Sequence, residues 1–262
     1  MIRALSVLLF LFLSTVPAMA QESVTLAVDI WPPYVTGQGD NEVGGFVTDI
    51  VRQAFTATGM KTEISFSSWK RCIEGVKHGE FTASYPWYDI PERHEFALFS
   101  EPICRLRYSI FYRRDRLGEF DYQNISDLKE YTVATLRGTI GEVLLKEAGV
   151  KALYPLTPDL CFRMLMAGRV DIVVEDLAAG RALIRNDYPD MIGKIATAKK
   201  PLKDDPAHLI VSRKNPAAQH IVERFNRGLE VLRESGEYDM ILKSYDVQEL
   251  GKGQTRNSII MH

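Results

Sequence analysis

One segment of the sequence combines an arginine with three aromatic side chains. It contains Tyr85, Trp87, Tyr88 and Arg93, with prolines at positions 86 and 91. An arginine offers a planar set of N–H donors that matches a carboxylate through two parallel hydrogen bonds. The alternative is an irregular loop that holds an ordinary surface arginine and packed aromatic rings. The segment therefore indicates either a grip for a small carboxylate or a structural loop.

The hydrophobic pattern predicts two successive sets of alternating strands and helices around this segment. Such alternation is typical of parallel sheets in α/β proteins. The prolines at 86, 91 and 102 are expected to exclude a regular helix or a central strand between them. The predicted strands are 24–30, 61–66, 81–84, 107–112, 131–136, 152–155, 170–174 and 207–212, and the predicted helices are 46–58, 69–77, 140–148, 159–167, 177–185, 217–234 and 238–245.

The N-terminus has the features of a secretory signal peptide. Arg3 precedes an apolar run over residues 4–13, and Ala18-Met19-Ala20 supplies small residues for cleavage before Gln21. A membrane anchor is the competing interpretation, but the run is shorter than the roughly 20 residues that cross a bilayer. We therefore expect residues 1–20 to be removed and the mature protein to be periplasmic, without direct membrane insertion. The tail, residues 251–262, is expected to be disordered.

Composition argues against several classes of protein. The 262 residues carry a net charge of −2, and no basic cluster resembles a nucleic-acid interface. The five histidines are scattered, and no spacing of histidine and cysteine fits zinc, so we expect no metal and no cofactor. Cys72, Cys104 and Cys161 permit at most one internal disulfide. Cys72 with Cys104 is the first pair to test, and buried free thiols are the alternative.

Seven short motifs then occur in a characteristic order and spacing. They are Trp31-Pro-Pro-Tyr34, Gly45-Phe-Val-Thr-Asp49, Ile90-Pro-Glu-Arg93 with Phe99-Ser-Glu-Pro102, Asp127-Leu-Lys129, Arg137-Gly-Thr139, Gly168-Arg-Val-Asp171 and Val211-Ser-Arg-Lys214. In this series the chain resembles the bacterial extracellular solute-binding proteins of family 3, the polar amino acid type that serves ABC transporters. The resemblance extends from Thr25 to about Val247.

The resemblance implies an α/β fold of two lobes, the type II periplasmic-binding-protein fold, with the ligand between the lobes. Lobe 1 would comprise residues 21–106 plus 209–250, and lobe 2 residues 107–208. Two crossing hinge strands, 107–112 and 207–212, would join them. The ligand would then favour a closed form by touching both lobes.

The resemblance also implies which residues bind. Arg93 matches the arginine that clamps a ligand carboxylate; the alternative is a structural ion pair with Glu92 or Glu101. Thr139 matches the position whose backbone N–H and hydroxyl complete the carboxylate site, and it also fits a helix cap.

Three further positions follow from the same comparison. Asp176 matches the acid that pairs with a ligand ammonium, but Glu175 precedes it, so either carboxylate could face the cleft. A helix N-cap is the alternative for Asp176. Trp31 matches an aromatic residue over the ligand, and Trp69 is expected near the same opening. Apolar packing is the alternative for both tryptophans.

The chain also departs from the family pattern. Small hydroxyl residues usually stand where this chain has Tyr85, Trp87, Tyr88 and Ile90. The pocket should therefore be smaller, or shaped for a flat or a cationic ligand, since aromatic faces stack on planar groups and attract ammonium groups.

The predicted function is a monomeric periplasmic binding protein, not an enzyme. It would capture a small polar ligand, an amino acid or a related carboxylate or amine, and deliver it to an ABC transporter permease. Two alternatives stay open. The first is a periplasmic dehydratase of the cyclohexadienyl type, with Glu175 or Asp176 as its acid, and the second is a ligand sensor for a membrane receptor.

Overall fold

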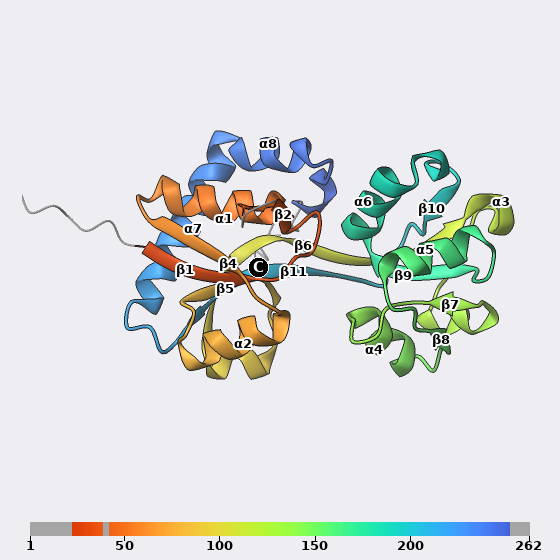
Figure 1. The fold of residues 1–262 in the computed structure, drawn as a ribbon, viewed down its shortest axis with the longest axis horizontal. Coiled ribbons are helices and arrows are strands. Elements are labelled where there is room, and N and C mark those ends of the chain that lie inside the picture. The colour runs from red at the N-terminus through yellow and green to blue at the C-terminus, as the bar shows by residue number, and fades with distance from the viewer. Residues whose placement is uncertain (1–22, 39–41, 252–262) are drawn as a thin grey trace, which may run out of the picture.

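The computed structural model describes residues 23–38 and 42–251. Its elements form two lobes, and two long strands, β6 (Ala97–Arg113) and β11 (Lys203–Ser212), pass from one lobe to the other (Figure 1). The predicted two-lobed α/β fold is confirmed. The predicted signal peptide lies outside the described residues, as do residues 252–262 of the predicted tail.

The first lobe contains the N-terminal elements and the last two α-helices. They are β1 (Ser23–Val28), β2 (Thr36–Gln38), β3 (Glu42–Gly44), α1 (Phe46–Ala57), β4 (Lys61–Phe66), α2 (Trp69–His78), β5 (Ala83–Tyr88), α7 (Ala218–Ser235) and α8 (Glu237–Ser244). Its strands lie in the order β4-β1-β5-β11-β6. Because side chains alternate along a strand, Leu26 packs in the core with α1 and α7, and Ala27 packs in the core with α2.

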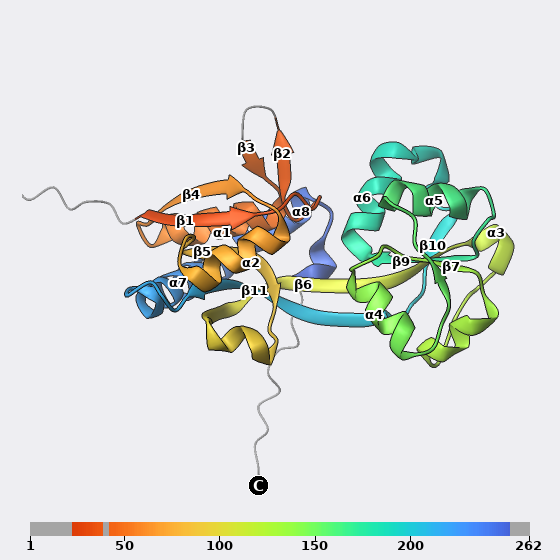
Figure 2. The same ribbon diagram turned by 60° about the horizontal axis from the view of Figure 1, so that its bottom comes forward.

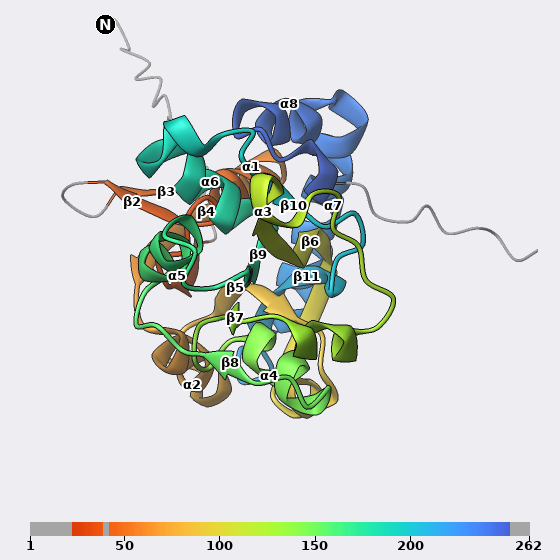
Figure 3. The same ribbon diagram turned by 90° about the vertical axis from the view of Figure 1, so that its right-hand side faces the viewer.

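The second lobe contains the middle of the chain. Its elements are α3 (Arg114–Leu117), β7 (Val133–Ala134), α4 (Ile140–Glu147), β8 (Ala152–Leu153), α5 (Pro158–Met166), β9 (Ile172–Asp176), α6 (Leu177–Asp187) and β10 (Ile195–Thr197). The strands continue the sheet in the order β6-β9-β7-β8, and β10 pairs with β6. Val173 packs in the core with α5, and Val174 packs in the core with α4. Figure 3 shows α5 and α6 on the opposite side of these strands from α4.

The expectation that the prolines would exclude a central strand is wrong, because Pro86 and Pro102 both lie inside strands of the sheet. Pro86 lies inside β5, where the pairing with β11 passes from Trp87–His208 to Ser84–Ile210, so two residues of β5 oppose one of β11. Pro102 lies inside β6 beside a second irregularity of the ladder. A proline has no N–H to donate and is tolerated at such bulges. The bulges therefore let β5 and β6 continue as strands past these prolines.

The crossing point lies where β6 and β11 pair between the lobes (Figure 2). Residues 108–112 of β6 already pair with β9 in the second lobe, and Ala207 and His208 of β11 pair with β5 in the first. The connecting segments are therefore 105–107 and 204–206, slightly earlier than the predicted strands 107–112 and 207–212. We propose that the first lobe ends at about residue 106 and resumes at about residue 207, close to the predicted boundaries of lobe 1 (residues 21–106 plus 209–250) and lobe 2 (residues 107–208).

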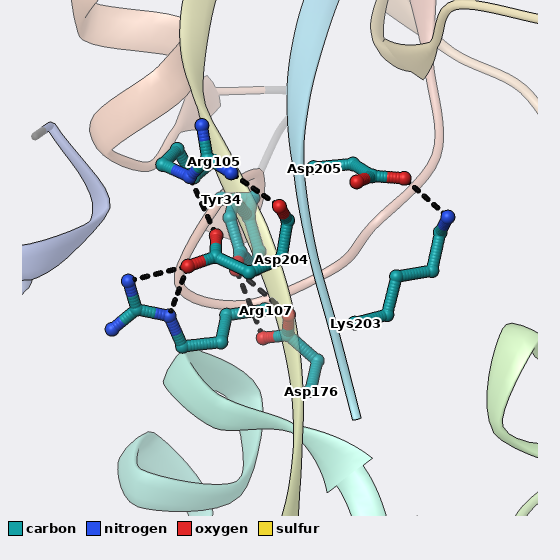
Figure 4. A network of polar contacts seen from close by, with 7 residues as sticks. All are labelled: Tyr34, Arg105, Arg107, Asp176, Lys203, Asp204 and Asp205. Carbon is teal, nitrogen blue, oxygen red and sulfur yellow. Dashed lines mark hydrogen bonds and ion pairs between the residues drawn. The ribbon is translucent and has the colours of Figure 1, made fainter. Parts of the chain in front are cut away.

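Ion pairs link the two connecting segments (Figure 4). Asp204 accepts hydrogen bonds from Arg105 Nε at 2.6 Å and from Arg107 Nη2 at 2.8 Å. Lys203 pairs with Asp205 on the same strand. The Asp204 side chain is about three-quarters buried, whereas that of Asp205 is 45% exposed. Asp204 therefore holds two strands together at the hinge, and Asp205 does not.

We expect Asp204→Asn to lower the free energy of unfolding by about 1 to 2 kcal/mol, because two partly buried guanidinium groups lose their anionic partner. Asp205→Asn is the matched control on the same strand and should cost less than about 0.5 kcal/mol. Urea titration of both variants measures the difference. Equal losses in the two variants would show that the bridge across the strands does not contribute specifically.

The described residues also bear on the expectations for membrane spans, metal sites and disulfides. No helix there is long and apolar enough to cross a membrane. No group of histidine, cysteine, aspartate and glutamate side chains there could hold a metal ion. Cys72, Cys104 and Cys161 are free, buried thiols, so the alternative to the Cys72–Cys104 disulfide is the one observed.

Candidate functional site

A cavity of about 730 Å³ lies between the lobes and is lined by residues of both. This volume falls within the range of roughly 300–1,000 Å³ that is typical of small-molecule sites. The predicted site residues in its lining are Trp31, Trp69, Trp87, Tyr88, Arg93 and Thr139. Tyr85 and Asp176 are not among the lining residues.

Three tryptophans form an aromatic wall on the first lobe. The rings of Trp31 and Trp69 lie 6.0 Å apart and those of Trp69 and Trp87 5.1 Å apart, both edge to face. Trp69 is held at the first turn of α2, because Ser68 caps this helix and Asp29 accepts the Trp69 backbone N–H at 2.9 Å. Edge-to-face contacts between aromatic rings are favourable. The wall is therefore held in place by contacts within the first lobe.

Arg93 lies beside this wall in a short 3-10 helix, Pro91–Glu95. Its guanidinium group stands 4.7 Å from the centre of the Trp87 ring, and Nη1 donates to the Tyr88 carbonyl oxygen at 2.6 Å. Burial lowers the pKa of Arg93, against opposing contributions from Glu92 and Asp89. None of the ion pairs among the described residues involves Arg93. The predicted alternative, an ion pair with Glu92 or Glu101, is therefore not observed among the described residues.

The two tyrosines of β5 have different surroundings. Tyr85 is fully buried in the first-lobe core, and its hydroxyl lies 3.2 Å from that of Thr48. Tyr88 lines the cavity, and its buried hydroxyl has no hydrogen-bond partner among the described residues. A buried polar group without a partner is costly. Tyr88 is thus the better candidate of the two for contact with a ligand.

Thr139 lies at the entrance of α4, as predicted. It is the N-cap residue, but its hydroxyl donates to the Leu136 carbonyl oxygen at 2.8 Å and does not cap the helix. The Glu142 carboxylate accepts the Gly138 N–H at 2.5 Å. A helix N-terminus favours negative charge. Here a carboxylate of the chain itself already lies against this end, so the role of Thr139 toward a ligand stays a prediction.

Both carboxylate oxygens of Asp176 are hydrogen-bonded to Tyr34 (Figure 4). The Tyr34 hydroxyl lies 2.9 Å from both carboxylate oxygens, and Oδ1 also accepts the Ala179 N–H at 2.9 Å as the N-cap of α6. Burial raises the pKa of Asp176 to about 7, although these hydrogen bonds oppose the shift. Tyr34 belongs to the first lobe and Asp176 to the second. Their bond therefore ties the lobes together beside the hinge instead of leaving Asp176 open to the cavity.

Glu175, the preceding residue, is the acid that lines the cavity. Its Oε1 accepts the Asp176 backbone N–H at 2.8 Å, and the side chain is almost fully buried. Burial, with the neighbouring Asp176, raises the pKa of Glu175 to about 8. Of the two carboxylates that the sequence left open, Glu175 is therefore the one in the cavity lining.

Several lining residues were not singled out from the sequence. Leu106 and Tyr108 come from the hinge strand β6, and Leu136, Ile140 and Leu183 come from the second lobe. Their apolar character is also typical of core residues, so composition carries no signal for them. Tyr34, which reaches Asp176, was quoted only as part of a motif.

Comparisons with known proteins agree with this architecture. The family model of bacterial extracellular solute-binding proteins, family 3, matches residues 24–248. A histidine kinase sensor domain with similarity to periplasmic binding proteins is 22% identical, with a TM-score of 0.68, over 86% of this chain and 96% of that one. The GluR0 ligand-binding core from Nostoc punctiforme, in complex with (L)-glutamate, is 22% identical, with a TM-score of 0.67, over 86% and 99%.

A third structure comes from a lineage with an enzymatic descendant. It is an ancestral amino acid-binding protein described as a precursor of cyclohexadienyl dehydratase, 18% identical, with a TM-score of 0.67, over 87% of this chain and 96% of that one. No curated protein matches the sequence significantly. At these identities the structural likeness establishes the fold alone.

Proposed function

Because this chain belongs to the bacterial extracellular solute-binding proteins of family 3, we propose that it captures a small carboxylate-bearing solute between its lobes and delivers it to an ABC transporter permease. One observation carries the proposal most strongly. A partly buried arginine, Arg93, lines the interlobe cavity without a carboxylate partner among the described residues. A buried charge is stable only when it is paired, and a ligand carboxylate would supply the pair.

The aromatic wall and the unpaired hydroxyl of Tyr88 support the same site. Both lobes line the cavity, so a ligand that touches both favours a closed form over an open one. A thermal-shift screen of small carboxylates, amino acids and amines tests binding directly. A ligand at 100 times its dissociation constant stabilises the folded state by about 2.7 kcal/mol. If no compound of the screen raises the melting temperature, the proposal is wrong.

We expect a compound that raises the melting temperature to shift the tryptophan fluorescence and to lower the radius of gyration in solution scattering. The physical reason is that all three tryptophans line the cavity, so closure changes their contact with water. Both signals should reverse on dialysis. A compound that gives no melting shift serves as the control. Tight binding without compaction would contradict closure of the lobes.

The periplasmic location and the transport role rest on the family and on the predicted signal peptide. N-terminal sequencing of the exported protein should find Gln21 as its first residue. If the role is transport, deletion of the permease that the protein serves abolishes uptake of the ligand. If uptake persists while a ligand-dependent response is lost with this protein, the sensor role is the correct one.

Glu175 favours a second candidate, an enzyme of the dehydratase type. A protonated carboxyl inside a cavity is suited to donate a proton to a bound substrate. We propose binding without chemistry as the primary function, and recovery of the ligand distinguishes the two. Mass spectrometry of the dialysed ligand should find it unchanged. A converted compound, whose formation stops in Glu175→Gln, would identify the protein as an enzyme.

A further inference from the structure

The walls of the cavity offer more apolar surface than polar groups. The first lobe contributes the rings of Trp31, Trp69 and Trp87, and the second lobe faces them with Ile140 and Leu183, among other aliphatic side chains. Apolar surface of this kind gains free energy when it is covered by an apolar ligand body, and flat groups stack on aromatic faces. The body of the ligand should therefore be apolar and flat.

One positively charged group in the lining is available to an anion. The guanidinium of Arg93 has five N–H donors, and the structure uses one of them for the Tyr88 carbonyl oxygen. Its position against Trp87 also means that a cation already occupies this aromatic face. A cationic ligand would meet the partly buried positive charge of Arg93 there. Of the two ligand types that the aromatic residues left open, the flat one agrees with this arrangement and the cationic one does not.

An α-amino acid needs an anion beside the carboxylate site, because its ammonium and carboxylate groups share one carbon atom. Asp176 does not supply it, since Tyr34 and the first turn of α6 take up its oxygens. Glu175 lines the cavity, but its Oε1 already accepts the Asp176 N–H, and the side chain is almost fully buried, which disfavours the charged form and raises its pKa. Asp187 is also in the lining, yet it is an exposed residue at the last position of α6.

We propose that the ligand is a monocarboxylate with a flat apolar body and no ammonium group beside the carboxylate, such as an arylalkanoic acid. The carboxylate pairs with Arg93, and the ring lies against the tryptophan wall. The Tyr88 hydroxyl is available as a further donor. This inference rests on the proposed function and specifies the ligand class of the same site.

Calorimetric titration of the mature chain with matched compounds tests the inference. The probes are 3-phenylpropionate, L-phenylalanine, which adds only the ammonium group, 2-phenylethylamine, which lacks the carboxylate, and propionate, which lacks the ring. We expect 3-phenylpropionate to bind at least tenfold more tightly than either L-phenylalanine or propionate, and 2-phenylethylamine not to bind.

The outcomes separate this inference from the proposed function. If L-phenylalanine binds as tightly as 3-phenylpropionate or more tightly, the ligand class is wrong and the solute-binding function stands. The same holds if only small polar carboxylates bind. If no carboxylate or amino acid binds in this series or in the thermal-shift screen, the ligand class and the solute-binding function are both wrong. As an independent readout, Trp69→Leu should weaken 3-phenylpropionate binding more than propionate binding, and equal losses would contradict contact between ring and wall.

Discussion

Replacing Arg93 by lysine is expected to weaken binding of the carboxylate ligand about 10- to 150-fold. Charge-assisted hydrogen bonds contribute about 1.5 to 3 kcal/mol, which corresponds to this range of dissociation constants. Lysine keeps the charge but not the planar pair of donors, so the bidentate geometry is lost. Its ammonium group is also a poorer match for the position over the Trp87 ring. Calorimetry with the compound that gives the largest melting shift measures the effect.

The control is Arg71→Lys. Arg71 is an exposed residue on α2 and does not line the cavity, so affinity should stay within about twofold. The melting temperature of each ligand-free variant separates binding from folding. An Arg93→Lys protein that binds normally but melts early would mean that Arg93 is structural, and the carboxylate clamp would have to be abandoned.

The second large effect concerns pH. We expect the free energy of unfolding to fall as pH rises from about 5 to about 8. Burial raises the pKa of Glu175 from 4.5 to about 8 and that of Asp176 from 3.8 to about 7. The native protein therefore retains protons that the unfolded chain has released, and raising the pH favours unfolding. Each carboxyl contributes a slope on the order of 1.4 kcal/mol per pH unit within its window.

The groups that face Glu175 do not reverse the expected fall of the free energy of unfolding with rising pH. Asp176 raises its pKa further, and neither Tyr108 nor Cys161, whose pKa values are themselves raised by burial, supplies a positive charge. Other carboxyls have lowered pKa values, so their stabilisation is lost only at more acidic pH, below this window. They are Asp115, Asp127, Glu142, Asp159 and Asp171.

Urea titrations at pH 5, 6.5 and 8 measure the slope. Glu175→Gln mimics the protonated acid. It should reduce the slope of the free energy of unfolding against pH by the amount that Glu175 contributes. Glu147→Gln, at an exposed position of α4, should leave it unchanged. A wild-type stability that rises between pH 5 and 8, or a slope that Glu175→Gln does not alter, would show that Glu175 is ionised in the native protein.

Much of the architecture was predictable from local patterns. The hydrophobic pattern predicted α1 and α2 closely, as helices over 46–58 and 69–77, because helix formation depends on neighbours a few residues away. The order of motifs predicted the family, and with it the two lobes and the place of Arg93 beside the cavity. These features are encoded within short stretches of chain.

The fine geometry of the site was decided by contacts between distant residues. Successive strand residues point to opposite faces, so no local signal tells which of Glu175 and Asp176 meets the cavity. Tyr34, 142 residues away in the sequence, engages Asp176 and leaves Glu175 in the lining.

The bulge at Pro86 likewise decides which way the side chains of β5 point. Its extra residue places Tyr85 in one core of the first lobe and Trp87 in the other, although strict alternation would put both on one face. The sequence by itself therefore determined the fold, the family and the aromatic and arginine content of the site. The tertiary structure alone decided which of these side chains reach the cavity, because strand register and long-range hydrogen bonds exist only once the lobes have formed.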